Sequence, residues 1–226
     1  PAPVWLNLEY LSAEPWVTGY HGLSSVEPRS GLTRYFFFPG FAEATGGLLR
    51  ESSLLARRDA FQQAPATRQA WLRGLGIEPA TDALLVSLFA YENSSAPGLL
   101  SAMAEAEQPL HLLVPQGRVS SSVASFLGQT LEAGTIAVRG ALSLQAIPFL
   151  SQADYDQLLW SCDLNCVRGE DSLVRALWAG KPLLWHIYPQ QDDAHIVKLE
   201  AFLKLYTRPL PDALARNMAA LWLAWN

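Results

Sequence analysis

Cysteine and histidine are scarce in this sequence, and their positions argue against disulfide and metal sites. The two cysteines are Cys162 and Cys166, which we expect on one buried strand. An i, i+4 spacing on a strand holds them too far apart for a disulfide bond, so we expect reduced thiols in a cytoplasmic protein. The four histidines show no metal-ligand spacing among themselves or with the cysteines, and we therefore expect no structural or catalytic metal.

Charge and long apolar segments are also scarce. Charged residues make up 16% of the chain and its net charge is −5, so nothing indicates bulk nucleic-acid binding. Every apolar run breaks well before the ~18 residues that suggest a membrane-spanning helix, and no signal peptide is visible. With 50% hydrophobic residues in 226 positions, the chain can still bury a substantial core. We expect neither nucleic acid nor membrane as a partner.

Three common enzyme signatures are missing as well. The sequence contains no glycine-rich dinucleotide fingerprint, no P-loop and no Gly-x-Ser-x-Gly elbow. These absences disfavour nicotinamide-dependent enzymes, NTPases and hydrolases with a nucleophile elbow.

Strands and helices are predicted to alternate regularly from Thr81 onward. Continuous apolar runs with helical segments between them predict buried strands at 84–91, 110–115, 163–167 and 182–187. Strands of this kind are typical of a parallel sheet with helices on both faces. We therefore expect an α/β fold whose ligands bind beyond the carboxyl ends of the strands.

The most informative stretch is Arg-Gly-Glu-Asp-Ser at 168–172, predicted as a turn before a helix at 173–179. A helix N-terminus attracts phosphate, and Arg168 and Ser172 would add hydrogen-bond donors. Glu170 and Asp171 would repel phosphate and fit sugar hydroxyls better, which indicates a nucleotide-sugar site. The bland alternative is helix capping, because Asp and Ser are common N-cap residues.

Other candidate ligand-binding residues follow the remaining predicted strands. Aromatic rings at strand ends can stack on a nucleobase, and Gln152 could hydrogen-bond its edge. For each ring, burial in the core is the alternative. The candidates share one rim of the predicted sheet: Phe89, Tyr91, Phe149, Leu150, Gln152, Tyr155 and Tyr188.

Four groups of segments resemble a known family: Asn7–Glu14, Phe37–Phe41 with Thr45–Glu51, Asp163–Ser172, and Trp178–Pro182 with Trp185–Gln190. The sequence resembles the bacterial protein-arginine rhamnosyltransferases that modify elongation factor P, and the matches are collinear over most of the chain. The resemblance implies a cytoplasmic GT-B glycosyltransferase, with two Rossmann-like domains and no metal or other cofactor. It implies dTDP-β-L-rhamnose as donor and an arginine of elongation factor P as acceptor, with inversion at the sugar.

The resemblance also implies roles for the candidate residues. Arg168, Asp171 and Ser172 would hold the pyrophosphate and the sugar, and Glu170 would be the catalytic residue. The donor pocket would further contain Phe89, Tyr91, Phe149, Leu150, Gln152, Tyr155 and Tyr188.

The domain organisation is likewise implied by the resemblance. Residues 1–50 correspond to the last part of the acceptor-side Rossmann-like domain, 51–80 to a linker, and 81–226 to the nucleotide-sugar binding domain. The presumed catalytic base of the family is an aspartate near the start of the N-terminal domain, a region that this sequence does not contain. The closing C-terminal helices are also missing. We therefore expect this chain alone to bind donor but to transfer sugar poorly or not at all.

Two alternatives stay open at this stage. Another GT-B enzyme would share the parallel sheet and the acidic turn but would prefer a UDP- or GDP-sugar. A nucleotide-binding regulatory module or an interaction domain would have no transferase activity. In that case the rim aromatics would be core residues, and Glu170→Ala would change stability rather than ligand binding.

Overall fold

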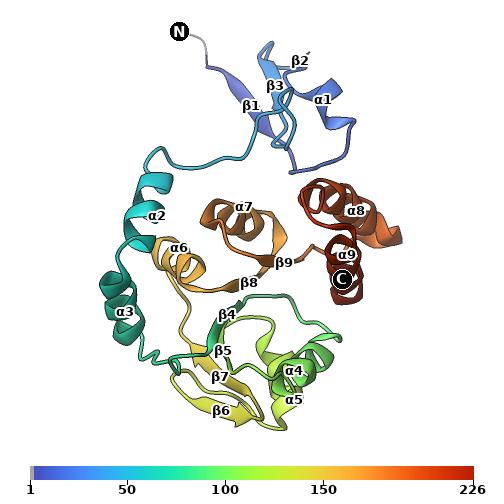
Figure 1. Ribbon diagram of the computed structural model, residues 1–226. Helices are drawn as coiled ribbons and strands as arrows, with labels where there is room; N and C mark the ends of the chain where they lie inside the picture. Colours follow the sequence, from blue (N-terminus) through green and yellow to red (C-terminus); the bar gives the residue numbers. More distant parts are fainter. Residues whose placement is uncertain (1–2) are drawn as a thin grey trace. The chain divides into compact units, whose positions relative to one another are not determined.

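A computed structural model describes residues 3–226 of the chain (Figure 1). The chain divides into two compact units, one made of residues up to 51 together with 189–223, and the other of residues 52–188 together with 224–226. In the described residues, no helix is both long and apolar enough to cross a membrane. The division into donor, linker and acceptor segments at residues 50 and 80 stays a prediction.

The first unit contains a three-stranded sheet. Its central strand is β3 (Thr33–Phe37), which runs parallel to β1 (Trp5–Leu8) and antiparallel to β2 (Ser24–Val26). The short helix α1 (Val17–Tyr20) connects β1 to β2.

Aromatic packing holds the C-terminal part of this unit together. It contains η1 (Gln191–Asp193), α8 (Ala194–Tyr206) and residues 212–223 of α9 (Asp212–Trp225). The ring of Phe202 stacks on that of Trp222 with 5.8 Å between ring centroids, and it also contacts the ring of Phe41 at 5.2 Å.

The second unit is built on a six-stranded sheet, in the order β6-β7-β5-β4-β8-β9. All neighbouring strands are parallel except β6 and β7. The continuous apolar runs of the sequence form three central strands and one edge strand of this sheet, and most of their side chains are buried, as predicted. The strands are β4 (Leu84–Leu88), β5 (Leu110–Pro115), β6 (Ile136–Arg139), β7 (Leu142–Ile147), β8 (Leu164–Arg168) and β9 (Leu183–His186).

Helices cover both faces of this sheet. Figure 1 shows α4 and α5 on one side and α6 and α7 on the other. The chain leaves β4 towards β5 but reaches β8, on the other side of β4, only after crossing over from β7. Ligands of open α/β sheets bind where the connections diverge in this way, here at the carboxyl ends of β4 and β8. The helices of this unit are α2 (Leu54–Gln62), α3 (Pro65–Gly74), α4 (Ala96–Ala104), α5 (Ser120–Leu127), α6 (Gln152–Ser161) and α7 (Gly169–Ala179).

A buried polar contact fixes β4 against β8. The Ser87 hydroxyl donates to Asn165 Oδ1 over 2.7 Å, and Asn165 Nδ2 donates to the Leu159 carbonyl over 3.0 Å. Both polar side chains are fully buried and cannot bond to water, so they need these hydrogen bonds within the protein. This pairing helps to set the register of the two strands that frame the site.

The strand-to-helix connection is shorter than the sequence suggested. The expected turn at 168–172 was wrong, because β8 ends at Arg168 and α7 begins at Gly169, with residues 170–172 in its first turn. Gly169 has φ +61°, a left-handed conformation that glycine adopts without strain, and this lets the chain turn within one residue.

The expected position of the two cysteines on one strand was also wrong. Cys162 follows α6 and lies before β8, so the two thiols do not share a strand, although both are buried. The expected parallel sheet is confirmed, with one antiparallel strand at its edge, because β6 and β7 are joined by only the two residues Gly140 and Ala141. A two-residue connection produces an antiparallel hairpin.

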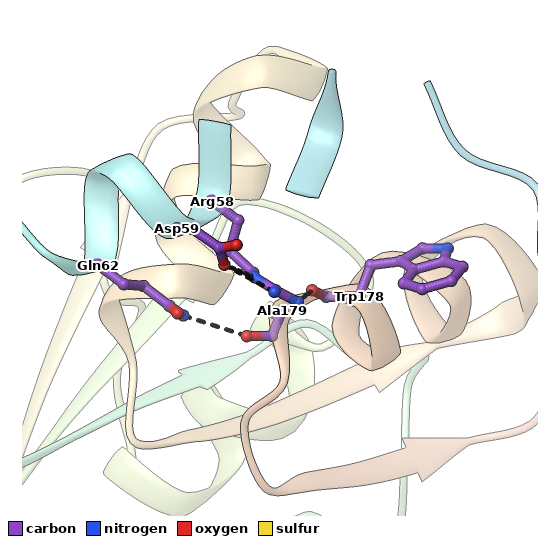
Figure 2. Close-up of polar contacts among 5 residues, drawn as sticks. All are labelled: Arg58, Asp59, Gln62, Trp178 and Ala179. Atoms are coloured by element: carbon purple, nitrogen blue, oxygen red, sulfur yellow. Dashed lines mark hydrogen bonds and ion pairs between the residues drawn. The ribbon is translucent and has the colours of Figure 1, made fainter. Parts of the chain in front are cut away.

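Helix α2 holds the C-terminal end of α7. Figure 2 shows Arg58 Nη1 donating to the Trp178 carbonyl over 2.7 Å and Gln62 Nε2 donating to the Ala179 carbonyl over 3.1 Å. Arg58 is also paired with Asp59 at 2.7 Å. The last carbonyls of a helix lack partners within it and carry partial negative charge, so a guanidinium there is favourable.

A buried ion pair joins α6 to the middle of α7. Arg175 Nε donates to Asp156 Oδ1 over 2.7 Å, and Arg175 Nη2 forms a second bond to the same carboxylate. The side chains are 10% and 3% exposed, respectively. A buried ion pair adds little to the free energy of unfolding compared with well-packed apolar side chains. A single buried charge without its partner, in contrast, is strongly destabilising.

We therefore predict that Arg175→Ala lowers the free energy of unfolding by about 3–5 kcal/mol, because it leaves the Asp156 carboxylate buried without its cation. Replacing both residues, as in Asp156→Leu with Arg175→Met, should cost clearly less. Urea denaturation of the three proteins measures both effects. Equal losses in the single and double variants would contradict this account.

The buried thiols predict how stability depends on pH. Burial raises the pKa of Cys166 to about 12, and that of Cys162 is raised for the same reason. Below pH ~7.5 the thiols are protonated in the folded and unfolded states alike. From about pH 8 up to about pH 12 the thiols of the unfolded chain ionise before those of the folded chain, so the free energy of unfolding must fall as pH rises. Urea denaturation across this range should show a shallower decline for Cys166→Ala than for the unsubstituted chain, and identical slopes would contradict the prediction.

Candidate functional site

A cavity of about 340 Å³ opens at the carboxyl ends of β4 and β8, within the volume range typical of ligand sites. It lies within the second unit, at the place that the strand connections predict. Its wall consists of Phe89, Tyr91, Arg118, Arg168, Gly169, Glu170, Asp171, Ser172 and Tyr188.

Arg168 is held in place by stacking. Its guanidinium carbon lies 4.4 Å from the ring centroid of Phe89 and 4.9 Å from that of Tyr91. Stacking on two rings orients the planar guanidinium but uses none of its N–H donors. Arg168 therefore offers directed hydrogen bonds and a positive charge to an anion in the cavity.

The first turn of α7 presents its polar groups to the same cavity. Arg168 occupies the N-cap position but makes no side-chain capping bond. Asp171 and Ser172, the residues of the capping alternative, lie inside the first turn of α7 and not at its N-cap. Glu170, Asp171 and Ser172 follow on the first turn and line the cavity. An anion-binding helix end beside two carboxylates matches a ligand that has both phosphate and hydroxyl groups.

The phenol of Tyr91 lies close to the backbone of this turn. A Cβ atom added to Gly169 would come within 2.8 Å of Tyr91 Oη. On the other side of the residue, the indole of Trp185 donates to the Gly169 carbonyl over 2.7 Å. Glycine is thus required at this position by both its backbone conformation and the space available.

Burial raises the pKa of Tyr91, and the nearby positive charge of Arg168 opposes this effect. Tyr91 is therefore a neutral hydroxyl at physiological pH, able to donate one hydrogen bond. Its ring contacts that of Tyr188 edge to face at 5.5 Å. Tyr188 is 60% exposed, so much of its ring is open to a ligand.

The structure separates the predicted residues into two groups. Seven line the cavity, whereas four that follow β7 do not, because β5 lies between β7 and β4. Phe149 is 74% exposed, Gln152 is exposed at the start of α6, and Leu150 packs against the core. Tyr155 packs against Phe89 at 5.5 Å and supports the cavity wall from behind. Their roles in ligand binding stay predictions.

Tyr155 has a buried hydroxyl without a partner of normal hydrogen-bond geometry. Burial raises its pKa, and the Ser172 hydroxyl is the nearby group that most opposes the increase. Tyr155 therefore remains protonated.

Sequence reasoning missed Arg118, which also lines the cavity. It lies in the loop after β5, and β5 is the neighbour of β4 opposite β8. The rule that ligands bind beyond the carboxyl ends of strands points to this loop as well, so the signal was present in the sequence.

A second cavity, of about 330 Å³, is lined by α3 residues and by residues 77–85 before and in β4. Its Arg68 already donates through Nε and Nη2 to the Ser161 carbonyl, over 3.0 and 2.6 Å. Within residues 3–226, no group of three or more His, Cys, Asp or Glu side chains is arranged to hold a metal. The first cavity, at the start of α7 and called the α7 cavity below, is therefore the stronger candidate for a ligand site.

Comparison with known proteins connects this geometry to one family. The model of the family described as "Elongation-Factor P (EF-P) rhamnosyltransferase EarP" matches residues 1–226. A protein-arginine rhamnosyltransferase of Pseudomonas putida KT2440 is 59% identical over 99% of this chain, and one of Pseudomonas aeruginosa PAO1 is 55% identical over 99%. The chain spans 59% of the length of each of these relatives.

A solved structure confirms the fold class. It is described as the structural basis for EarP-mediated arginine glycosylation of translation elongation factor EF-P, and it matches 99% of this chain and 84% of its own chain. The TM-score is 0.75 at 40% sequence identity. The expected α/β fold of the GT-B type, with a Rossmann-like sheet, is therefore correct.

The close approach of Gly169 and Tyr91 can be tested by substitution. We predict that Gly169→Ala destabilises the protein more than Gly128→Ala, a matched control with φ +73° and no atom within 4 Å of the added Cβ. Each change should cost about 1–2 kcal/mol for the left-handed backbone, and only the first also displaces Tyr91.

Adding Tyr91→Phe removes the hydroxyl nearest the new Cβ and should recover part of the Gly169→Ala loss. Chemical denaturation of the single and double variants gives the coupling between the two sites. Equal losses for the two glycine variants, or no recovery in the double variant, would show that the contact is unimportant.

Proposed function

The chain belongs to the EarP family of elongation factor P rhamnosyltransferases, and from this membership we propose that its α7 cavity binds the nucleotide-sugar donor of an arginine rhamnosylation reaction. The observation that carries the proposal is the cavity itself, where Arg168, the first turn of α7 and Glu170 meet at the divergence of β4 and β8. Cationic and acidic groups side by side suit a ligand with a diphosphate and a sugar.

The proposed donor is dTDP-β-L-rhamnose. Its diphosphate would bind the N-terminus of α7, with Arg168 and Ser172 as hydrogen-bond donors. The carboxylates of Glu170 and Asp171 would accept hydrogen bonds from hydroxyl groups of the sugars. The base would stack on the exposed ring of Phe149, which lies outside the cavity wall, and Gln152 would hydrogen-bond its edge.

The proposed reaction inverts the anomeric carbon of rhamnose. A guanidinium nitrogen of an elongation factor P arginine attacks that carbon while the bond to the diphosphate oxygen breaks. The leaving diphosphate takes the electron pair, and Arg168 with the N–H groups of α7 stabilises the charge. We propose that these groups allow donor binding without a metal ion.

The attacking nitrogen must lose a proton, and arginine is fully protonated in water. A carboxylate must therefore orient the acceptor and accept its proton as the new bond forms. We propose that this base belongs to the additional length that the relatives carry. Glu170 would act on the donor side, holding the sugar in the geometry for attack. The proposed site of action is the cytoplasm, where elongation factor P takes part in translation.

Donor binding is tested by calorimetric titration of the chain with dTDP-β-L-rhamnose and with UDP-glucose, each with and without EDTA. We expect saturable binding of the thymidine sugar only, unaffected by EDTA. Glu170→Ala should weaken it about tenfold or more, because it removes charged hydrogen bonds. Phe149→Ala should weaken it about tenfold through lost stacking. Glu105→Ala, which removes an exposed carboxylate at the end of α4, serves as the control.

The other outcomes assign the protein differently. Preference for UDP-glucose would indicate a GT-B enzyme with another donor. A Glu170→Ala variant that loses stability but binds donor normally would favour a structural role for the first turn of α7. Binding that EDTA abolishes would contradict the proposed metal independence.

A further inference from the structure

Arg118 is a cation of the α7 cavity that the proposed donor site does not yet use. The backbone of its loop is held by the Ser121 hydroxyl, which donates to the Arg118 carbonyl over 3.2 Å, and by the next residue, Val119, which is fully buried. The Arg118 side chain, in contrast, is exposed. Across residues 3–226 its guanidinium makes no hydrogen bond or ion pair. The backbone at Arg118 is thus fixed, while its exposed guanidinium is available to a ligand.

The strand order places Arg118 and Arg168 on either side of Tyr91. Tyr91 lies just beyond β4, which pairs with β5 on one edge and with β8 on the other. Arg118 follows β5, and Arg168 ends β8. Both positive charges act on the Tyr91 phenol, where they oppose the increase in its pKa that burial causes. The loop of Arg118 also passes close to the cavity, because a Cβ atom added to Gly117 would lie 3.6 Å from the Phe89 ring.

The charge balance of the cavity wall depends on Arg118. Without it, the wall would hold the two carboxylates of Glu170 and Asp171 and only one cationic side chain, that of Arg168. A wall with excess negative charge repels a diphosphate. Arg118 brings the wall to two cations and two anions, and the N-terminus of α7 then adds partial positive charge.

We propose that Arg118 is a second phosphate-binding residue, which contacts the diphosphate of the nucleotide from the side of the cavity opposite Arg168. This inference rests on the proposed nucleotide-sugar function and deepens it. Arg168, stacked on two rings, provides a fixed contact, whereas the exposed Arg118 closes on the phosphates once the nucleotide is bound. The free nucleoside diphosphate carries more negative charge than its sugar ester, so it depends more strongly on Arg118.

Titration with dTDP, dTDP-β-L-rhamnose and thymidine tests the proposal. Arg118→Ala should weaken dTDP binding about tenfold, weaken the sugar ester less, and leave thymidine unchanged. Arg118→Lys should recover part of the loss, because it restores the charge without the planar donor group. Raising the ionic strength should reduce the difference in dTDP affinity between Arg118→Ala and the unsubstituted chain. Arg29→Ala, which removes an exposed arginine of the other unit, is the matched control.

The outcomes separate this inference from the function on which it rests. If Arg168→Ala weakens dTDP binding but Arg118→Ala does not, the inference is wrong and the proposed function stands. If the unsubstituted chain binds neither dTDP nor its sugar ester, both are wrong. Equal weakening of thymidine and dTDP by Arg118→Ala would overturn the inference too, because it would indicate a general change in the pocket. Thermal unfolding of each variant shows whether it is folded.

Discussion

The parallel pairing of β4 with β8 is the constraint on which the site depends. These strands are neighbours in the sheet, but the chain leaves them towards helices on opposite faces, so a hollow remains beyond their ends. The buried bond between Ser87 and Asn165 ties them at adjacent positions. A slip of one residue would break this bond and reverse the faces of the β8 side chains, Arg168 among them. The register of one strand pair therefore decides which charges meet in the cavity.

Helix α7 is stabilised in its middle and at its C-terminal end by side chains that lie away from the cavity. Side chains of α2 bond its C-terminal carbonyls, and the Asp156–Arg175 pair holds its middle. At its N-terminus the Arg168 side chain stacks on two rings instead of capping the helix. Contacts remote from the cavity thus fix the helix, while the Arg168 side chain lies in the cavity wall.

The sequence allowed the sheet to be predicted more fully than the site. Continuous apolar runs such as Leu84–Leu88 identify buried strands because few other structures bury every side chain. The direct connection at Gly169 could not be predicted in the same way, since glycine fits a long turn and a sharp one equally well. The cavity wall depends on which loops become neighbours. Phe149 and Arg118 both follow strands, and only the strand order shows that β5, and not β7, lies beside β4.

The same strand order has a consequence for how the protein is made. Residues 87 and 165 are 78 positions apart in the sequence. The pairing of β4 with β8 therefore cannot form until the ribosome has synthesised all the residues between them. During that time one edge of a mostly apolar strand is unpaired, which exposes the nascent chain to misassociation. The cavity wall draws on residues after β4, β5 and β9 and on the start of α7, so it is completed only when the polypeptide has been extended past residue 188. A translational pause before that point would prolong the most aggregation-prone stage of folding.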